Sequence, residues 1–73
     1  MFTYRIHLIA EPEGGFTVLV PILPGCITYG ETVAEAKEMA QEAIALYIEE
    51  LVSRDEPIPD DSNTLEYSLQ IAV

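Results

Sequence analysis

Basic residues are scarce in this chain of 73 residues: it has three of them against 13 acidic residues, and its formal net charge is −10. The three are Arg5, Lys37 and Arg54, which are scattered along the sequence and cannot supply a basic stripe. A surface of this charge repels the phosphate backbone, and nucleic-acid binding depends on clustered lysines and arginines. We therefore expect no direct binding of DNA or RNA.

Cysteine and histidine occur once each, as Cys26 and His7. A single cysteine cannot form an internal disulfide. A Cys–His catalytic pair requires hydrogen-bond contact and a third group that orients the base, and the spacing of these two residues indicates neither. We expect Cys26 to pack as a small apolar residue and His7 to lie on an open sheet face. No enzymatic activity is expected.

Long apolar runs are also missing. No stretch of the sequence approaches the roughly 20 residues that are needed to span a bilayer. The first residues do not combine the charged, apolar and small-residue regions of a secretory signal. We therefore expect a cytoplasmic protein that makes no contact with membranes.

The length indicates one domain, residues 1–73, because domains commonly contain about 100–150 residues. Area scaling gives a folded surface of about 4,500 Å² and an unfolded one of about 11,700 Å², so roughly 60 % of the surface is buried on folding. A core this thin leaves little net stability, and self-association or a partner would complete it.

Apolar residues alternate with other residues in several segments, which is the period of a β-strand with one buried face. The first segment covers residues 2–10 and the second covers residues 16–22, and the glycines between them predict a hairpin. A brief third strand is expected over residues 26–29. The alternation returns over residues 65–73, which we predict to be the last strand.

Local motifs predict a turn and a helix. Pro24 and Gly25 suit the central positions of a type II turn, where proline fixes φ and glycine adopts the positive φ. Thr32 and Glu35 form the T-x-x-E pattern of a capping box. This signal, followed by apolar residues at helical spacing, predicts a helix over residues 33–52.

The expected fold class is α+β, in a single domain with the element order β-β-β-α-β. A four-stranded sheet would bury its apolar face under one helix packed on that face, and would leave Arg5 and His7 on an open, mostly polar face. The connection from the third strand through the helix to the fourth should be a right-handed crossover. Pro57 and Pro59 predict a loop over residues 53–64.

The carboxylates of this loop are Asp55, Glu56, Asp60 and Asp61. A calcium loop of the EF-hand type needs glycine at its sixth position and glutamate at its twelfth, and this loop has neither the glycine nor the register. We interpret these residues as solvated loop charge, with weak and non-specific divalent binding as the alternative. No cofactor is expected.

One face of the predicted helix is acidic and carries two apolar side chains. Its members are Glu35, Glu38, Met39, Glu42, Leu46 and Glu49. Apolar residues within an acidic rim are typical of a contact site for a partner or for a second copy. The alternative is a solvated helix face with two exposed apolar residues, which single proteins commonly show.

The negative charge is concentrated in the second part of the chain. Residues 1–30 contain one base and two acids, for a net charge of −1. Residues 31–73 contain two bases and 11 acids, for a net charge of −9. A basic partner would be attracted to this second part.

A series of motifs in a fixed order makes the sequence resemble the HicB family of antitoxins. An aromatic-rich first strand and a Gly-Gly-Phe hairpin precede the central residues of the pattern, and Pro57-Ile-Pro59 closes it. The central residues are Pro21, Leu23, Pro24, Gly25, Cys26, Thr28, Gly30, Thr32, Glu35 and Ala36. The resemblance covers nearly the whole chain and rests on order and spacing together.

The resemblance implies a partial RNase H-like fold and a homodimer or homotetramer. It also implies a non-enzymatic antitoxin that binds HicA, a small basic toxin with a double-stranded-RNA-binding-like fold that cleaves mRNA, and covers the active site of that toxin. Fuller family members append a DNA-binding domain, which we do not expect within residues 1–73. The alternative is a solitary homo-oligomeric module of this family that has no cognate toxin.

Overall fold

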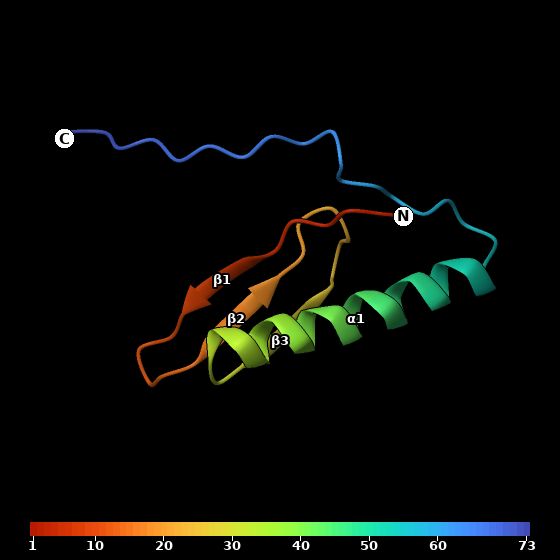
Figure 1. Ribbon diagram of the computed structural model, residues 1–73, viewed down its shortest axis with the longest axis horizontal. Helices are drawn as coiled ribbons and strands as arrows, with labels where there is room; N and C mark the ends of the chain where they lie inside the picture. The colour runs from red at the N-terminus through yellow and green to blue at the C-terminus, as the bar shows by residue number, and fades with distance from the viewer.

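The computed structural model describes all 73 residues and shows three antiparallel strands covered on one face by a single long helix (Figure 1). The strands are β1 (His7–Ala10), β2 (Phe16–Leu19) and β3 (Ile27–Gly30), and they lie in the order β1-β2-β3. The helix α1 (Val33–Ser53) follows β3 and packs mainly across β3 and β2. The α+β class and the single domain are as predicted.

β1 and β2 form the predicted hairpin. The N–H of Gly14 donates to the Glu11 carbonyl at 3.0 Å, and the N–H of Glu11 donates to the Gly15 carbonyl at 3.0 Å. Gly14 and Gly15 have φ values of 105° and 79°, which glycine adopts without a steric penalty. The register places Leu8 opposite Val18, and Val18, in the central strand, is completely buried.

The connection between β2 and β3 contains the predicted type II turn. The N–H of Cys26 donates to the Leu23 carbonyl at 3.0 Å, and Gly25 has a φ of 81°. A second bond, from the Val20 N–H to the Cys26 carbonyl at 3.1 Å, closes the wider loop. Leu23 and Cys26 fold inward and pack against Val20. Because the chain turns here, β2 ends at Leu19 and does not reach residue 22.

The helix begins with the predicted cap. Thr32 Oγ1 accepts a hydrogen bond from the Glu35 N–H at 3.1 Å. In a standard capping box the Glu35 carboxylate would pair with the Thr32 N–H, but here it accepts from the N–H of Glu31 at 2.7 Å. The first bond satisfies a backbone donor that the first helical turn leaves without a partner, and the second satisfies the N–H of the residue before the cap.

Gly30 allows β3 and α1 to approach closely. A Cβ atom at this position would lie 2.4 Å from the backbone nitrogen of Ala36 and 2.5 Å from its Cα. Ala36 and Ala40 are buried against Val18 and form one of the two small core clusters. The small side chains along this contact keep the helix close to the sheet.

The helix ends in a Schellman motif. The Glu56 N–H donates to the Leu51 carbonyl at 2.9 Å, and the Asp55 N–H donates to the Val52 carbonyl at 3.1 Å. Asp55 has a φ of 57° and occupies the left-handed position that glycine usually fills. The helix therefore continues to Ser53, one residue beyond the predicted end.

The predicted fourth strand does not form in the single chain. Residues 65–73 are exposed, make no backbone hydrogen bond to the rest of the chain and extend away from the sheet as an arm (Figure 1, blue). The prediction of a four-stranded sheet with a crossover is therefore wrong for one chain. Alternation of apolar residues indicates a strand but does not indicate which sheet edge the strand pairs with. Here the arm contacts the start of β1 through Glu66 and His7 and then diverges from it. The partial RNase H-like fold stays a prediction.

Candidate functional site

The predicted contact residues lie together on the solvent side of α1. They are Glu35, Glu38, Met39, Glu42, Leu46 and Glu49, and we name this set the acidic helix face. At 100° per residue they fall within an arc of about 100° around the helix axis. Met39 is half-buried, and the other members are exposed.

Leu46 is the apolar centre of the acidic helix face. It is 65 % exposed, and it lines a shallow hollow of about 350 Å³ together with Ile27 and Tyr47. Ile27, from β3, is 62 % exposed, and sequence reasoning missed it. The signal that could have identified it is the order of the strands, because the third strand of a simple antiparallel meander lies at the sheet edge.

The carboxylates of Glu38, Glu42 and Glu49 have no cationic partner. The ion pairs of the structure lie elsewhere, at Arg54 beyond the end of α1, and His7 contacts Glu66 beside the arm. Like charges at i,i+4 on a helix destabilise it by about 0.2–0.5 kcal/mol per pair. The acidic helix face therefore weakens the isolated helix slightly and presents a negative potential that a cationic partner would neutralise.

The motif residues within residues 21–36 hold this face in position. Leu23 and Cys26 are buried in the turn, and Gly30 permits the close contact with α1. The Tyr47 hydroxyl donates to the Pro24 carbonyl at 2.7 Å and fastens the turn to the helix. The Glu35 carboxylate accepts the hydrogen bond from the Glu31 N–H at the helix cap and lies at the N-terminal end of the acidic helix face.

His7 and Cys26 lie as predicted, and no hydrogen bond joins their side chains. The imidazole of His7 is half-exposed, and its Nε2 lies 2.6 Å from Glu66 Oε2. Cys26 is 6 % exposed and packs against Val20 and Leu23. Burial raises the pKa of the Cys26 thiol, and a protonated thiol is a weak nucleophile.

Asp60 and Asp61 fasten the loop after α1 to the start of the chain. Asp60 Oδ1 accepts from the Thr3 N–H at 3.1 Å, and Asp61 Oδ2 accepts from the Arg5 N–H at 3.1 Å. Asp61 is only 4 % exposed, so its interpretation as solvated loop charge is wrong. These bonds use the backbone N–H groups of Thr3 and Arg5, and β1 begins only at His7.

Hydrogen bonds lower the pKa of both carboxyl groups. For Asp60 the main cause is the bond from the Thr3 N–H, with further bonds from Ser62. For Asp61 the main cause of the lowered pKa is hydrogen bonding from the Thr64 side chain, and Arg5 adds to it through its N–H and its charge. Both carboxylates therefore stay ionised at a lower pH than an ordinary aspartate does.

Two further geometric findings concern metal ions and membranes. No three or more His, Cys, Asp or Glu side chains gather closely enough to hold a metal ion. The structure also contains no helix whose length and apolar character would let it cross a membrane.

Comparison with known proteins connects this fold to a family. The sequence model of the family described as "HicB_like antitoxin of bacterial toxin-antitoxin system" matches residues 4–71. The chain belongs to the HicB-like antitoxin family. The match includes the buried turn, the cap of α1 and most of the arm. The family pattern therefore covers the sheet and helix as well as residues 65–71 of the arm.

Relatives of the HicB-like chain occur in bacteria and archaea. Antitoxin HicB of Escherichia coli (strain K12) is 36 % identical to it, over 94 % of this chain and 54 % of its own length. A UPF0150 protein of Synechocystis is 38 % identical over 84 % of this chain and 77 % of its own length. A UPF0150 protein of Thermoplasma acidophilum is 42 % identical over 81 % of this chain and 86 % of its own length. The match therefore spans about half of Antitoxin HicB and most of each UPF0150 protein.

Proposed function

We propose that this HicB-like chain neutralises a small basic ribonuclease toxin of the HicA type by binding it and covering its active site. Family membership supports the toxin–antitoxin role. The observation that carries the proposal is the acidic helix face, where Glu38, Glu42 and Glu49 lie unpaired around the exposed Leu46. The chain acts by occlusion and supplies no catalytic group.

Electrostatics favour such a partner. An enzyme that cleaves RNA binds phosphates, so the surface around its active site is expected to be positive. A chain with a net charge of −10 is attracted to that surface, and such steering raises association rates by roughly 10- to 1,000-fold. The acidic helix face would then compete with RNA for the same cationic side chains.

Affinity requires an apolar contact in addition to charge. Charges at the rim of an interface mainly change the association rate, whereas a few desolvated apolar side chains near the centre supply most of the binding free energy. Leu46 with Ile27 and Tyr47 around the shallow hollow forms such a centre, and Met39 lies about two turns before Leu46 on the same side of the helix. An apolar side chain of the toxin would occupy the hollow.

The test is co-expression with the small basic reading frame beside the gene of this chain. We expect the product of that frame to stop growth, and this chain to restore growth and to co-purify with it. If that product is not toxic, or if this chain neither restores growth nor co-purifies, the antitoxin function is wrong here. A solitary homo-oligomeric module would then be the better interpretation.

A pair of variants locates the contact. Met39→Glu combined with Leu46→Glu should abolish rescue and co-purification while leaving the circular dichroism of the free chain largely unchanged. Val52→Glu is the matched control, because Val52 is also on α1 and 61 % exposed but lies outside the acidic helix face. Association that survives the double substitution would place the toxin on another surface.

A further inference from the structure

Residues 65–73 have the pattern of a sheet strand but pair with nothing in their own chain. Their apolar members are Leu65, Tyr67, Leu69, Ile71 and Val73. These side chains occupy every second position, and each residue is at least 74 % exposed. An extended segment with one apolar face and unpaired backbone groups requires a neighbouring strand and an apolar surface.

The arm gives the chain more surface than its mass requires. The solvent-accessible surface is 5670 Å², which is about 1,200 Å² above the roughly 4,500 Å² that area scaling gives for a folded chain of this mass. The radius of gyration is 13.9 Å, against about 11 Å for a compact domain of this length. A standard interface buries about 800 Å² on each partner, so the excess is large enough to form one.

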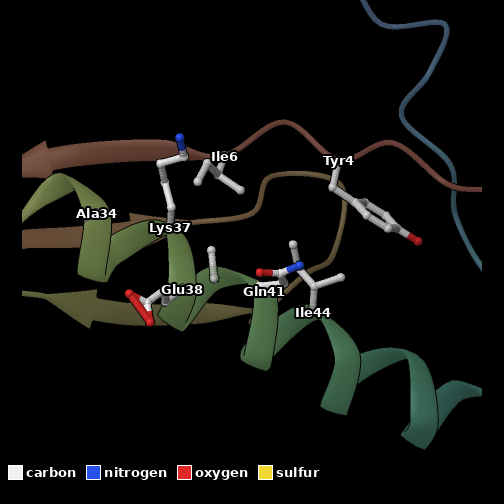
Figure 2. A pocket seen from close by; sticks show the side chains of 8 residues that line it. Tyr4, Ile6, Ala34, Lys37, Glu38, Gln41 and Ile44 are labelled. Atoms are coloured by element: carbon white, nitrogen blue, oxygen red, sulfur yellow. The ribbon is translucent and has the colours of Figure 1, made fainter.

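An apolar groove lies between α1 and the segment that leads into β1 (Figure 2). It has a volume of about 610 Å³ and lies between Tyr4 and Ile6, just before β1, and Ala34, Lys37, Gln41 and Ile44 of the helix. The groove exists because α1 packs over β3 and β2 and leaves the helix-facing side of β1 largely uncovered.

The outer edge of β1 is free beside this groove. The strand order β1-β2-β3 leaves β1 at the side of the sheet. A strand added at this edge would pair its backbone groups with those of β1, and every second side chain would point to the helix side of the sheet. Because the edge beside Thr3 and Arg5 is bonded to Asp60 and Asp61 of the same chain, those side chains would enter the groove from the β1 end, next to Ile6.

We infer that residues 65–73 of a second copy of this chain occupy the free edge of β1 and fill the groove with their apolar side chains. The exchange is reciprocal: each copy contributes one arm and one groove, so a single two-fold interface satisfies both. The four-stranded sheet that the alternation predicts is then completed by a strand from the partner copy. The inference does not depend on the proposed function.

The path of the arm favours a second copy over closure on its own groove. Asp61 is bonded to the backbone of Thr3 and Arg5, and Glu66 is bonded to His7, so the start of the arm is fastened beside β1 of its own chain. From there the arm extends away from the sheet (Figure 1). None of its residues lines the groove of its own chain.

Charge does not oppose this contact between two acidic chains. Glu66 is the one acidic side chain within residues 65–73, and that segment has no basic one. The groove carries Lys37 and Glu38, whose charges cancel. Most of the net charge of −10 lies elsewhere, and at physiological salt it is screened beyond about 8 Å.

The exchange is tested with the chain alone, without a toxin, so that its failure leaves the proposed function standing. Light scattering at about 0.15 M salt is expected to give a dimer or an assembly of dimers. In a one-to-one mixture of isotope-labelled and unlabelled chains, isotope-filtered NMR is expected to show contacts between the arm of one copy and Tyr4, Ile6 and Ile44 of the other. A monomer at every concentration, or arm contacts within one chain only, would overturn the inference.

A matched pair of variants tests the orientation of the arm. Leu69→Asp combined with Ile71→Asp places charge on its apolar side and should raise the dimer dissociation constant roughly 100-fold or more. Ser68→Asp combined with Gln70→Asp adds the same charge on the other side and should raise it less than about tenfold. Equal effects of the two pairs, or a dimer that the first pair leaves intact, would also overturn the inference.

Discussion

Replacement of Gly30 by alanine tests the packing of the sheet on the helix. The new Cβ would lie 2.4 Å from the Ala36 nitrogen, 2.5 Å from the Ala36 Cα and 2.9 Å from the carbonyl carbon of Glu35. All three atoms belong to the backbone of the first turn of α1, so no side chain can rotate away and the helix itself must move. We expect Gly30→Ala to lower the free energy of unfolding by about 3 kcal/mol, at the upper end of the usual range for overpacking.

Gly25 supplies the matched control for this substitution. Gly25→Ala adds the same methyl group, but no atom lies within 4 Å of the new Cβ, and only the positive φ of 81° opposes it. A left-handed backbone costs an L-residue about 1–2 kcal/mol. The steric contact between β3 and α1 is therefore tested by whether Gly30→Ala costs more than the roughly 1–2 kcal/mol expected for Gly25→Ala.

The measurement is urea unfolding followed by circular dichroism, with the free energies compared at one protein concentration because self-association would add to the apparent stability. A small domain has a total stability of only about 5 kcal/mol, so Gly30→Ala should remove more than half of it. A Gly30→Ala chain that is no less stable than Gly25→Ala would refute the close approach of β3 and α1.

Three further predictions concern the end of the helix, the buried loop and the toxin complex. Asp55→Gly relieves the left-handed backbone at the end of α1 and should raise the free energy of unfolding by about 1 kcal/mol in the same urea assay; a decrease would contradict the Schellman motif. Asp61→Asn should lower the melting temperature at neutral pH, and this difference should disappear in acid. Because the pKa of Asp61 is lowered on folding, its contribution to stability is complete above the unfolded pKa of about 3.9 and is lost as the pH falls through the folded pKa. A difference in melting temperature that stays constant down to a pH of about 2 would argue against an ionised carboxylate. The toxin complex should dissociate more readily as salt is raised from about 0.05 to 0.5 M, because Glu38 and Glu42 are exposed to screening; an affinity independent of salt would contradict the electrostatic part of the proposed function.

Features that depend on neighbouring residues could be predicted from the sequence. The type II turn at Gly25 and the cap at Thr32 rest on φ preferences and on bonds between residues three positions apart. The helix bounds follow from the same local signals, and the acidic helix face follows from helical spacing. The left-handed Asp55 was not predicted, because aspartate is not the usual residue at that position.

Features that depend on which distant segments meet could not be predicted in this way. Asp61 was assigned to a solvated loop, because nothing local shows that it binds the backbone of Arg5, 56 positions away. Ile27 joins Leu46 around one hollow only after the sheet is packed on α1. The pattern of residues 65–73 specifies a strand with one apolar face, but it does not say whether the sheet that receives it belongs to the same chain.

The two proposed contacts use different sides of α1, so one HicB-like chain can make both at once. At 100° per residue, Lys37 and Gln41 beside the groove lie roughly 130° around the helix from the centre of the acidic helix face. Glu38 lies at the border between the groove and the acidic helix face, whereas Leu46 belongs to the acidic helix face alone. Exchange of arms would therefore complete the thin core and still leave two acidic helix faces exposed on a dimer. The substitution Leu46→Glu should then weaken toxin binding without changing the assembly, and the aspartate pair on the arm should do the reverse.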